Sequence, residues 1–177
     1  MSTNDRRQAF HIEIRCVYSA TLDNTLTCVS VGACLSELRD ANPVTWLPEL
    51  APSAELAGQL TGGRVDEHEF RRRYSLELEQ RSEPCEWLRS GACNFGLALM
   101  TEDDDTSRCA ADGLKQHLEN LECRRRWRKG LMIGGYVYHL KDEIEQAGGL
   151  WFSRHKTWMM PDRETWERIQ SLLPGDF

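Results

Sequence analysis

An acidic turn is the first feature of the sequence that could do chemistry. Residues 102–105 read Glu-Asp-Asp-Asp and follow the apolar run of residues 95–100. Carboxylate oxygens are ligands that Mg²⁺ prefers, and α/β folds place ligand sites beyond the carboxyl ends of their strands. Glu102, Asp103 and the nearby Arg108 are therefore candidates for metal-dependent phosphoryl chemistry. An ordinary exposed loop explains the same residues, and the further acids or lysine of a nuclease are not identifiable.

A run of arginines is the second such feature. Residues 124–129 read RRRWRK, which places five positive charges around Trp127 and suits contact with phosphate oxygens and one stacked base. The basic turn at residues 154–156 would extend this surface. The candidate nucleic-acid-binding residues are Arg124, Arg125, Arg126, Arg128, Lys129, Trp151, Arg154, Lys156 and Trp158. The alternative is structural, since cations favour a helix C-terminus and tryptophans pack across hairpins.

The cysteines and histidines indicate no cofactor. The chain has seven cysteines, none of them spaced as in a zinc knuckle, and most lie in apolar stretches. We interpret them as reduced, buried, small hydrophobic residues, with a metal site built from distant cysteines left open. The histidines form no metal-spaced pair, and no phosphate-binding glycine loop is present. Mg²⁺ is expected only if the acidic turn is catalytic.

Charge is distributed unevenly along the chain. The 22 basic and 28 acidic residues give a net charge of -6, which excludes a uniformly basic nucleic-acid binder. Residues 1–120 carry -8 and residues 121–177 carry +2. No run approaches the ~20 apolar residues of a membrane span, and the N-terminus has no apolar secretory segment. We therefore expect a cytoplasmic protein without a membrane partner.

The elements that must position these residues form two predicted parts. Apolar patterns predict strands at residues 10–18, 26–31 and 95–100, with helices between and after them. Asp66 and Glu69 predict a capping box at one helix start. This order indicates an α/β fold with a small, largely parallel sheet and flanking helices over residues 1–123.

Residues 124–177 predict a second, smaller part. Leu131 to Ile133 read as a strand, residues 140–147 as a helix, and residues 151–160 as a β-hairpin. A final helix starts at Pro161-Asp162. The result is a Trp-rich β-α-β-β-α module that follows a basic entry segment.

Residues 44–80 carry a set of aromatic, apolar and polar positions that resembles the central signature of the bacterial domain-of-unknown-function 488 family. The matching residues are Trp46, Leu50, Pro52, Ser53, Leu56, Phe70, Tyr74, Glu77 and Leu78. The resemblance covers roughly residues 10–120 and implies a small α/β fold without a settled activity.

The sequence departs from that family at two places. Members usually carry a segment that ends Trp-Pro-Arg-Gly after the second strand, and residues 32–40 have no such ending. Members often place an Asn-His or His-Arg pair in the turn after the last strand, where residues 106–109 retain only Arg108. The resemblance therefore implies a diverged member that has lost chemistry and is used for binding.

Residues 131–173 resemble a small module of phage and bacterial DNA-processing proteins. Its pattern is a strand, a K-D-x-(I/L) helix, G-G-x-W, a basic turn and K-x-W-x-x-P. The matching residues are Lys141, Asp142, Ile144, Gly148, Gly149, Trp151, Lys156, Trp158 and Pro161. This likeness implies a nucleic-acid-associated role.

Three functions fit these observations. The first is a non-enzymatic intracellular protein that binds DNA or RNA through its basic C-terminal module, with a protein partner on its acidic N-terminal domain. The second is a metal-dependent enzyme that acts on a nucleic acid or nucleotide through the acidic turn. The third is an acidic protein-interaction factor of a mobile element.

Overall fold

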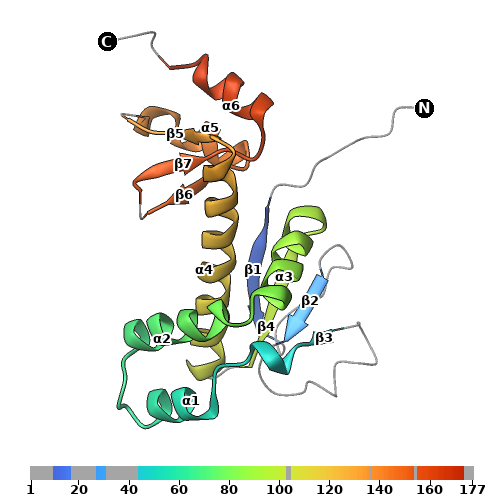
Figure 1. Ribbon diagram of the computed structural model, residues 1–177, viewed down its shortest axis with the longest axis vertical. Coiled ribbons are helices and arrows are strands. Elements are labelled where there is room, and N and C mark those ends of the chain that lie inside the picture. Colours follow the sequence, from blue (N-terminus) through green and yellow to red (C-terminus); the bar gives the residue numbers. More distant parts are fainter. Residues whose placement is uncertain are drawn as a thin grey trace, which may run out of the picture. The chain divides into compact units, whose positions relative to one another are not determined.

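The computed structural model describes residues 10–16, 27–30, 44–102, 105–135, 137–153 and 155–173 of the 177-residue chain (Figure 1). The chain forms two compact units, Met1–Leu118 and Glu119–Phe177, which we call unit 1 and unit 2. The division falls inside helix α4 (Asp105–Arg128), a few residues before the boundary predicted at residues 123 and 124.

Unit 1 contains a four-stranded sheet in which every described pairing is parallel. The strands, in the order β1-β4-β2-β3, are β1 (Ile12–Cys16), β4 (Leu97–Thr101), β2 (Thr27–Ser30) and β3 (Thr45–Trp46). All five residues of β4 are buried, and this strand lies between β1 and β2. The apolar run that predicted it is typical of a central parallel strand, and the predicted α/β fold is confirmed.

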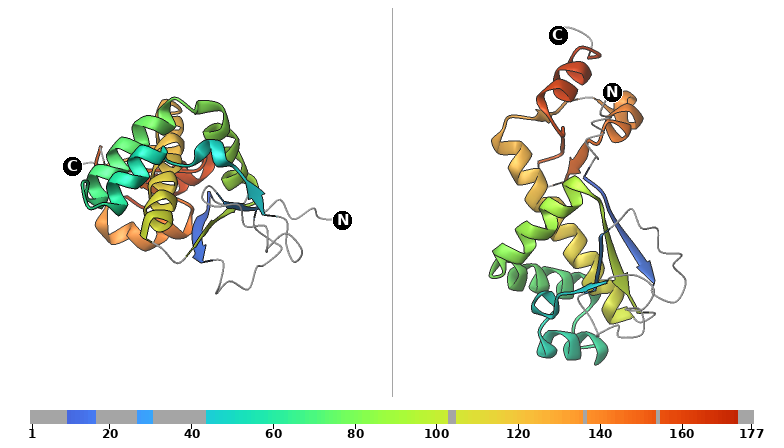
Figure 2. Two further views of the ribbon diagram at one scale, coloured as in Figure 1. Left: turned by 90° about the horizontal axis from the view of Figure 1, so that it is seen from below. Right: turned by 90° about the vertical axis from the view of Figure 1, so that its right-hand side faces the viewer.

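The helices of unit 1 gather on one face of this sheet (Figure 2). Before α4 they are the 3-10 turn η2 (Pro48–Leu50), α1 (Ala54–Thr61), α2 (Glu67–Glu79) and α3 (Ser82–Asn94). Helix α2 starts as predicted, because Asp66 Oδ1 accepts a hydrogen bond from the Glu69 backbone N–H at 2.8 Å. The Glu69 carboxylate, however, bonds to Arg72 and Arg73, so only the Asp66 half of the predicted capping box forms.

Unit 2 follows the predicted β-α-β-β-α order. After α4 come β5 (Met132–Ile133), η3 (Tyr138–Leu140), α5 (Lys141–Gln146), β6 (Leu150–Phe152), β7 (Thr157–Met159) and α6 (Arg163–Gln170). The strands form an antiparallel sheet in the order β5-β7-β6. Gly148 follows α5 with φ +78°, a conformation that favours glycine and ends the helix.

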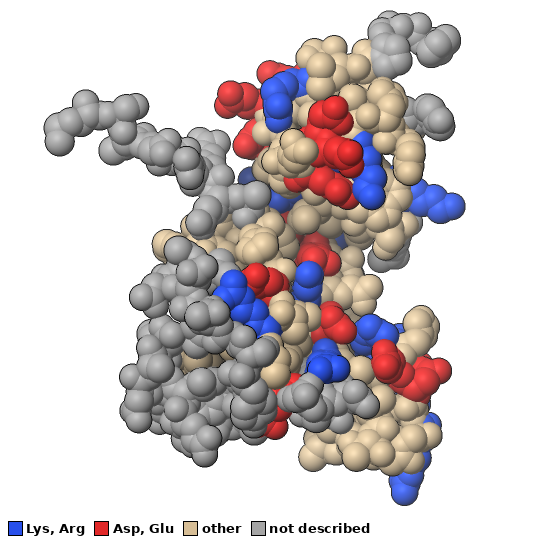
Figure 3. Space-filling view, turned by 180° about the vertical axis from the view of Figure 1, so that it is seen from behind, with Lys and Arg blue, Asp and Glu red and all other residues tan. Residues whose placement is uncertain are grey.

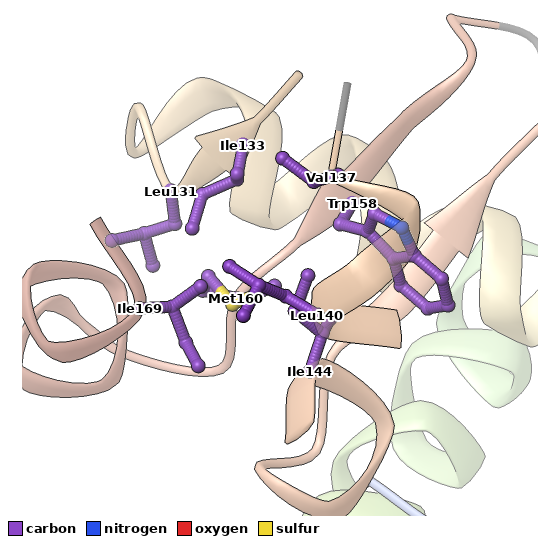
Figure 4. Close-up of a cluster of buried hydrophobic side chains, with 8 residues drawn as sticks. All are labelled: Leu131, Ile133, Val137, Leu140, Ile144, Trp158, Met160 and Ile169. Atoms are coloured by element: carbon purple, nitrogen blue, oxygen red, sulfur yellow. The ribbon is translucent and has the colours of Figure 1, made fainter. Parts of the chain in front are cut away.

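Unit 2 has its own hydrophobic core (Figure 4). Its buried members come from β5, η3, α5, β7 and α6 and from residues next to these elements: Leu131, Ile133, Val137, Leu140, Ile144, Trp158, Met160 and Ile169. Trp166 packs against this cluster and its indole N–H donates to the Met132 carbonyl at 2.8 Å. A module of this size thus contains enough apolar side chains to fix its strands and helices against one another.

The cysteines described by the structure behave mainly as core residues. Cys28, Cys85, Cys109 and Cys123 are buried free thiols, while Cys16 and Cys93 are partly exposed. Burial raises the pKa of Cys85 to about 11 and that of Cys123 to about 12, so both are neutral thiols at pH 7. Cys34 lies outside the described residues. No helix within the described ranges is long and apolar enough to cross a membrane.

Candidate nucleic-acid interface

Helical geometry divides the arginine run at the end of α4 between two sides of the helix. Arg126 is only 2% exposed, whereas Arg124 and Arg128 are exposed. Residues four apart lie on the same side of a helix, and a residue two positions away lies near the opposite side. Arg124 and Arg128 therefore face solvent together, and Arg126 points into the interior of unit 2.

Arg126 connects α4 to two other segments in the interior of unit 2. Its Nε donates to Glu122 Oε1 at 2.7 Å, and its Nη1 donates to the carbonyls of Gly148 and Met159 at 2.8 and 2.9 Å. Glu122 is fully buried and also pairs with Arg125 at 2.6 Å. Since Arg126 is buried and its guanidinium is bonded to the protein, its prediction as a phosphate contact is corrected to a structural role.

The same contacts keep the buried Glu122 ionised. Burial alone would raise the pKa of its carboxyl, but the hydrogen bonds from Arg125 and Arg126 outweigh burial and lower the pKa to about 2. A buried carboxylate needs such partners, because an unpaired charge in the interior is strongly destabilising. Arg125 retains about a third of its side-chain exposure, so it lies at the edge of the exposed surface.

The exposed cations gather around an aromatic contact. Trp127 stacks on His155 with ring centroids 4.5 Å apart and planes 28° apart, which places the last turn of α4 beside the β6–β7 turn. Around this stack lies a surface that we call the basic rim: Arg124, Trp127, Arg128, Lys129, His155 and Lys156. Among the described residues, no carboxylate lies within ion-pair distance of Arg128, Lys129 or Lys156. Arg154, predicted to belong to this surface, lies outside the described residues.

Trp151 and Trp158 form a separate feature of unit 2. They are cross-strand partners on β6 and β7, and their rings pack 5.3 Å apart at 60°. Trp158 is 8% exposed, and Trp151 is 49% exposed. The cavity beside them is lined by Glu119 and Glu145. Carboxylates repel phosphate, so we leave these two predicted nucleic-acid contacts out of the basic rim.

The structure describes the acidic turn only in part. Glu102 is partly buried just after β4, and Arg108 is exposed on α4. Asp103 lies outside the described residues. Across the part of the chain that the structure describes, no three His, Cys, Asp or Glu side chains come together as a metal site.

The signature residues of unit 1 form a clamp between α2 and the chain that precedes α1. Tyr74 Oη donates to the Leu50 carbonyl at 2.5 Å, and Glu77 accepts hydrogen bonds from Ser53 Oγ at 2.6 Å and Ser53 N at 2.9 Å. Arg81 Nη1 donates to the Ala51 carbonyl at 2.6 Å. We call Leu50, Ser53, Tyr74, Glu77 and Arg81 the signature clamp; their polar atoms bind the protein itself.

The sequence patterns do not indicate two residues that the structure shows to be important for packing. Arg81 lies just beyond the signature helix, and Glu122 lies four residues before Arg126. Glu122 had a signal, because Glu followed by Arg at i+4 is a favourable helical pair. The burial of that pair depends on strands β6 and β7, which no helical pattern indicates.

The arginines of α2 and α3 also bind glutamates of their own helices. The pairs are Arg71–Glu67, Arg72–Glu69, Arg73–Glu69 and Arg89–Glu86. In the lower, described part of the face drawn in Figure 3, acidic and basic side chains lie next to one another.

Fold and site together define a class: an α/β domain whose polar signature is structural, followed by a small tryptophan-rich module with a basic rim. The family model of the inactive DUF488-N3 subclade matches residues 36–130, which is more than half of the chain. The chain belongs to this family. No match was found among curated proteins or among solved structures. The family model ends before residue 131, so the resemblance of residues 131–173 to a DNA-processing module stays a prediction.

Proposed function

We propose that the protein is a non-enzymatic binding protein that contacts nucleic acid through the basic rim of unit 2. The observation that carries the proposal is the set of exposed cations beside the Trp127–His155 stack. Arg128, Lys129 and Lys156 have no described carboxylate within ion-pair distance. Exposed cations beside an aromatic ring suit a phosphate backbone with a base at its side.

The absence of an enzymatic role is supported by two observations. The matched family model describes an inactive subclade. The polar residues of the signature clamp also form hydrogen bonds with backbone atoms and with one another. These residues therefore stabilise the contact between α2 and the chain before α1, and they leave binding as the function to test.

The proposal is tested by fluorescence anisotropy with labelled single-stranded DNA, duplex DNA and single-stranded RNA of equal length at low salt. We expect at least one probe to bind wild-type protein. The variant R128Q/K129Q should bind about tenfold more weakly, because each lost phosphate contact removes counterion release from the binding equilibrium.

A matched control removes two exposed cations elsewhere. The variant R64Q/R168Q lowers the net charge by the same amount but leaves the basic rim intact. It should bind within about twofold of wild type. If no probe binds at low salt, or if the control loses as much affinity as R128Q/K129Q, the proposal is wrong.

A further inference from the structure

The cavity of unit 2 differs from the basic rim in its chemistry. It has a volume of about 290 Å³ and is lined by Glu119, Cys123, Glu145, Gly149, Leu150, Trp151 and Trp158. Its walls are thus aromatic and acidic. A cavity of this volume is at the small end of ligand sites, which suits one side chain better than a large organic ligand.

The aromatic wall consists of two indole rings that differ in their exposure to solvent. Trp158 is held in the core of unit 2 (Figure 4), while Trp151 is half exposed. Their planes are tilted at 60°, so the rings form a corner rather than a flat stack. The faces of indole rings carry negative charge density and attract cations that approach within ~6 Å of the ring centre.

The acidic wall adds charges of the sign that a cation requires. Glu145 lies on α5 and Glu119 on α4, and both line the cavity. Glu145 forms an exposed ion pair with Lys141 at 3.7 Å, and pairs of this kind contribute little stability. An incoming cation can therefore displace Lys141 from Glu145.

The remaining lining residues add no positive charge. A side chain on Gly149 would meet the Ile144 carbonyl oxygen at 2.7 Å, so this glycine allows the close packing of β6 against α5. Cys123 is buried, and burial raises the pKa of its thiol to about 12. The thiol is neutral at pH 7 and neither attracts nor repels a cation.

We infer that this cavity binds a lysine or arginine side chain of a basic segment in a partner protein. Two indole rings supply cation–π contacts, and Glu145 supplies an ionic contact, to one ammonium or guanidinium group. The lining carboxylates disfavour phosphate. The inference is independent of the basic rim, which lies around Trp127 and His155.

The test titrates the full-length chain with an acetylated, amidated triarginine peptide and follows the indole N–H resonances by NMR. We expect the resonances of Trp151 and Trp158 to shift and that of Trp87, an exposed tryptophan of unit 1, to stay in place. A tricitrulline peptide has nearly the same shape without the charge, and it should cause no shift.

Variants locate the binding site. W151A should weaken the triarginine peptide about tenfold and W151F less, since a smaller ring retains part of the cation–π attraction. E145Q should weaken it about threefold. K141Q should strengthen it, because it removes the competing cation from Glu145. E143Q, an exposed carboxylate of α5 outside the cavity lining, is the matched control and should change the affinity by less than twofold.

The test does not depend on any one variant being stable. W151A changes the aromatic wall and E145Q changes the acidic wall, and the two peptides are first compared on the wild-type protein. Equal binding of the tricitrulline peptide would show that charge is not recognised. Shifts caused by tetramethylammonium but not by the triarginine peptide would assign the cavity to a small quaternary cation. Either result overturns the proposal.

Discussion

Unit 1 and unit 2 differ in where their helical arginines lie and in what surrounds them. On α2 and α3, Arg71, Arg72, Arg73 and Arg89 each lie beside a glutamate of their own helix. At the end of α4, Arg126 is buried against Glu122, while Arg128 is exposed with no described carboxylate at ion-pair distance. A local count of charges therefore does not identify a binding surface. The side of the helix on which each cation lies, and what packs there, decides its role.

The largest effect is expected from removing the buried arginine. R126A leaves Glu122 buried with one partner fewer and leaves the carbonyls of Gly148 and Met159 without this donor. Breaking a buried ion pair costs about 3–5 kcal/mol. Urea denaturation followed by tryptophan fluorescence should show this loss.

The exposed neighbour provides the control. R128A should change the free energy of unfolding by no more than about 0.5 kcal/mol, as is usual for surface positions. Equal destabilisation by R126A and R128A would remove the distinction between buried and exposed arginines on which the comparison depends.

Acid should weaken unit 2 through Glu122. The pKa of its carboxyl is about 2 in the folded protein, against an ordinary value of 4.5. A carboxyl with a depressed folded pKa contributes stability that is complete above the unfolded pKa and is lost as the pH falls through the folded pKa. Unfolding free energies should therefore fall between pH 4.5 and 2 in wild type.

The variant E122Q isolates this contribution. It should be less stable than wild type at pH 7, and its stability should depend less on pH over the same interval. A pH dependence identical to that of wild type would show that Glu122 does not titrate as the contacts with Arg125 and Arg126 require.

A moderate effect is expected in the signature clamp. Y74F removes the hydroxyl that donates to the Leu50 carbonyl and leaves a buried acceptor without this partner, which costs about 1–3 kcal/mol. Thermal unfolding should show the loss, while nucleic-acid affinity at low temperature should be unchanged. If a folded Y74F protein bound nucleic acid more weakly than wild type, unit 1 would contribute to the binding surface. The assignment of binding to unit 2 alone would then be wrong.

The smallest effect belongs to Lys156. This residue has φ +49°, a left-handed conformation that asparagine tolerates well, so K156N removes a charge without straining the turn. Stability should stay within about 0.5 kcal/mol, and nucleic-acid affinity should fall two- to threefold in the anisotropy assay. An unchanged affinity would remove Lys156 from the basic rim.

Much of the fold follows from local patterns. The alternation around Ile12, the apolar run at Leu97–Thr101 and the cap at Asp66 each predict an element that the structure contains. Helices are predicted between the second and third strands, but the bounds of α3 (Ser82–Asn94) are not, because its N-cap residue Arg81 makes no side-chain cap. The strand β3 (Thr45–Trp46) is two residues long, which is too short for an alternating pattern to reveal.

The candidate site was predicted only in outline. The sequence indicates where the cations are, and it places Trp127 among them. It does not reveal that Arg126 turns inward, because that depends on the carbonyls of Gly148 and Met159, which come from segments far along the chain. The stack of Trp127 on His155 likewise depends on how the β6–β7 turn packs beside α4.

The salt dependence of binding shows whether the basic rim contacts phosphate. For duplex DNA, the slope of log K against log salt is about -0.9 per phosphate contact, so R128Q/K129Q should have a slope shallower than wild type by roughly 1.8. The control R64Q/R168Q should keep the wild-type slope. A wild-type slope in R128Q/K129Q would contradict the account, because the exposed cations of the basic rim would then make no contact with phosphate.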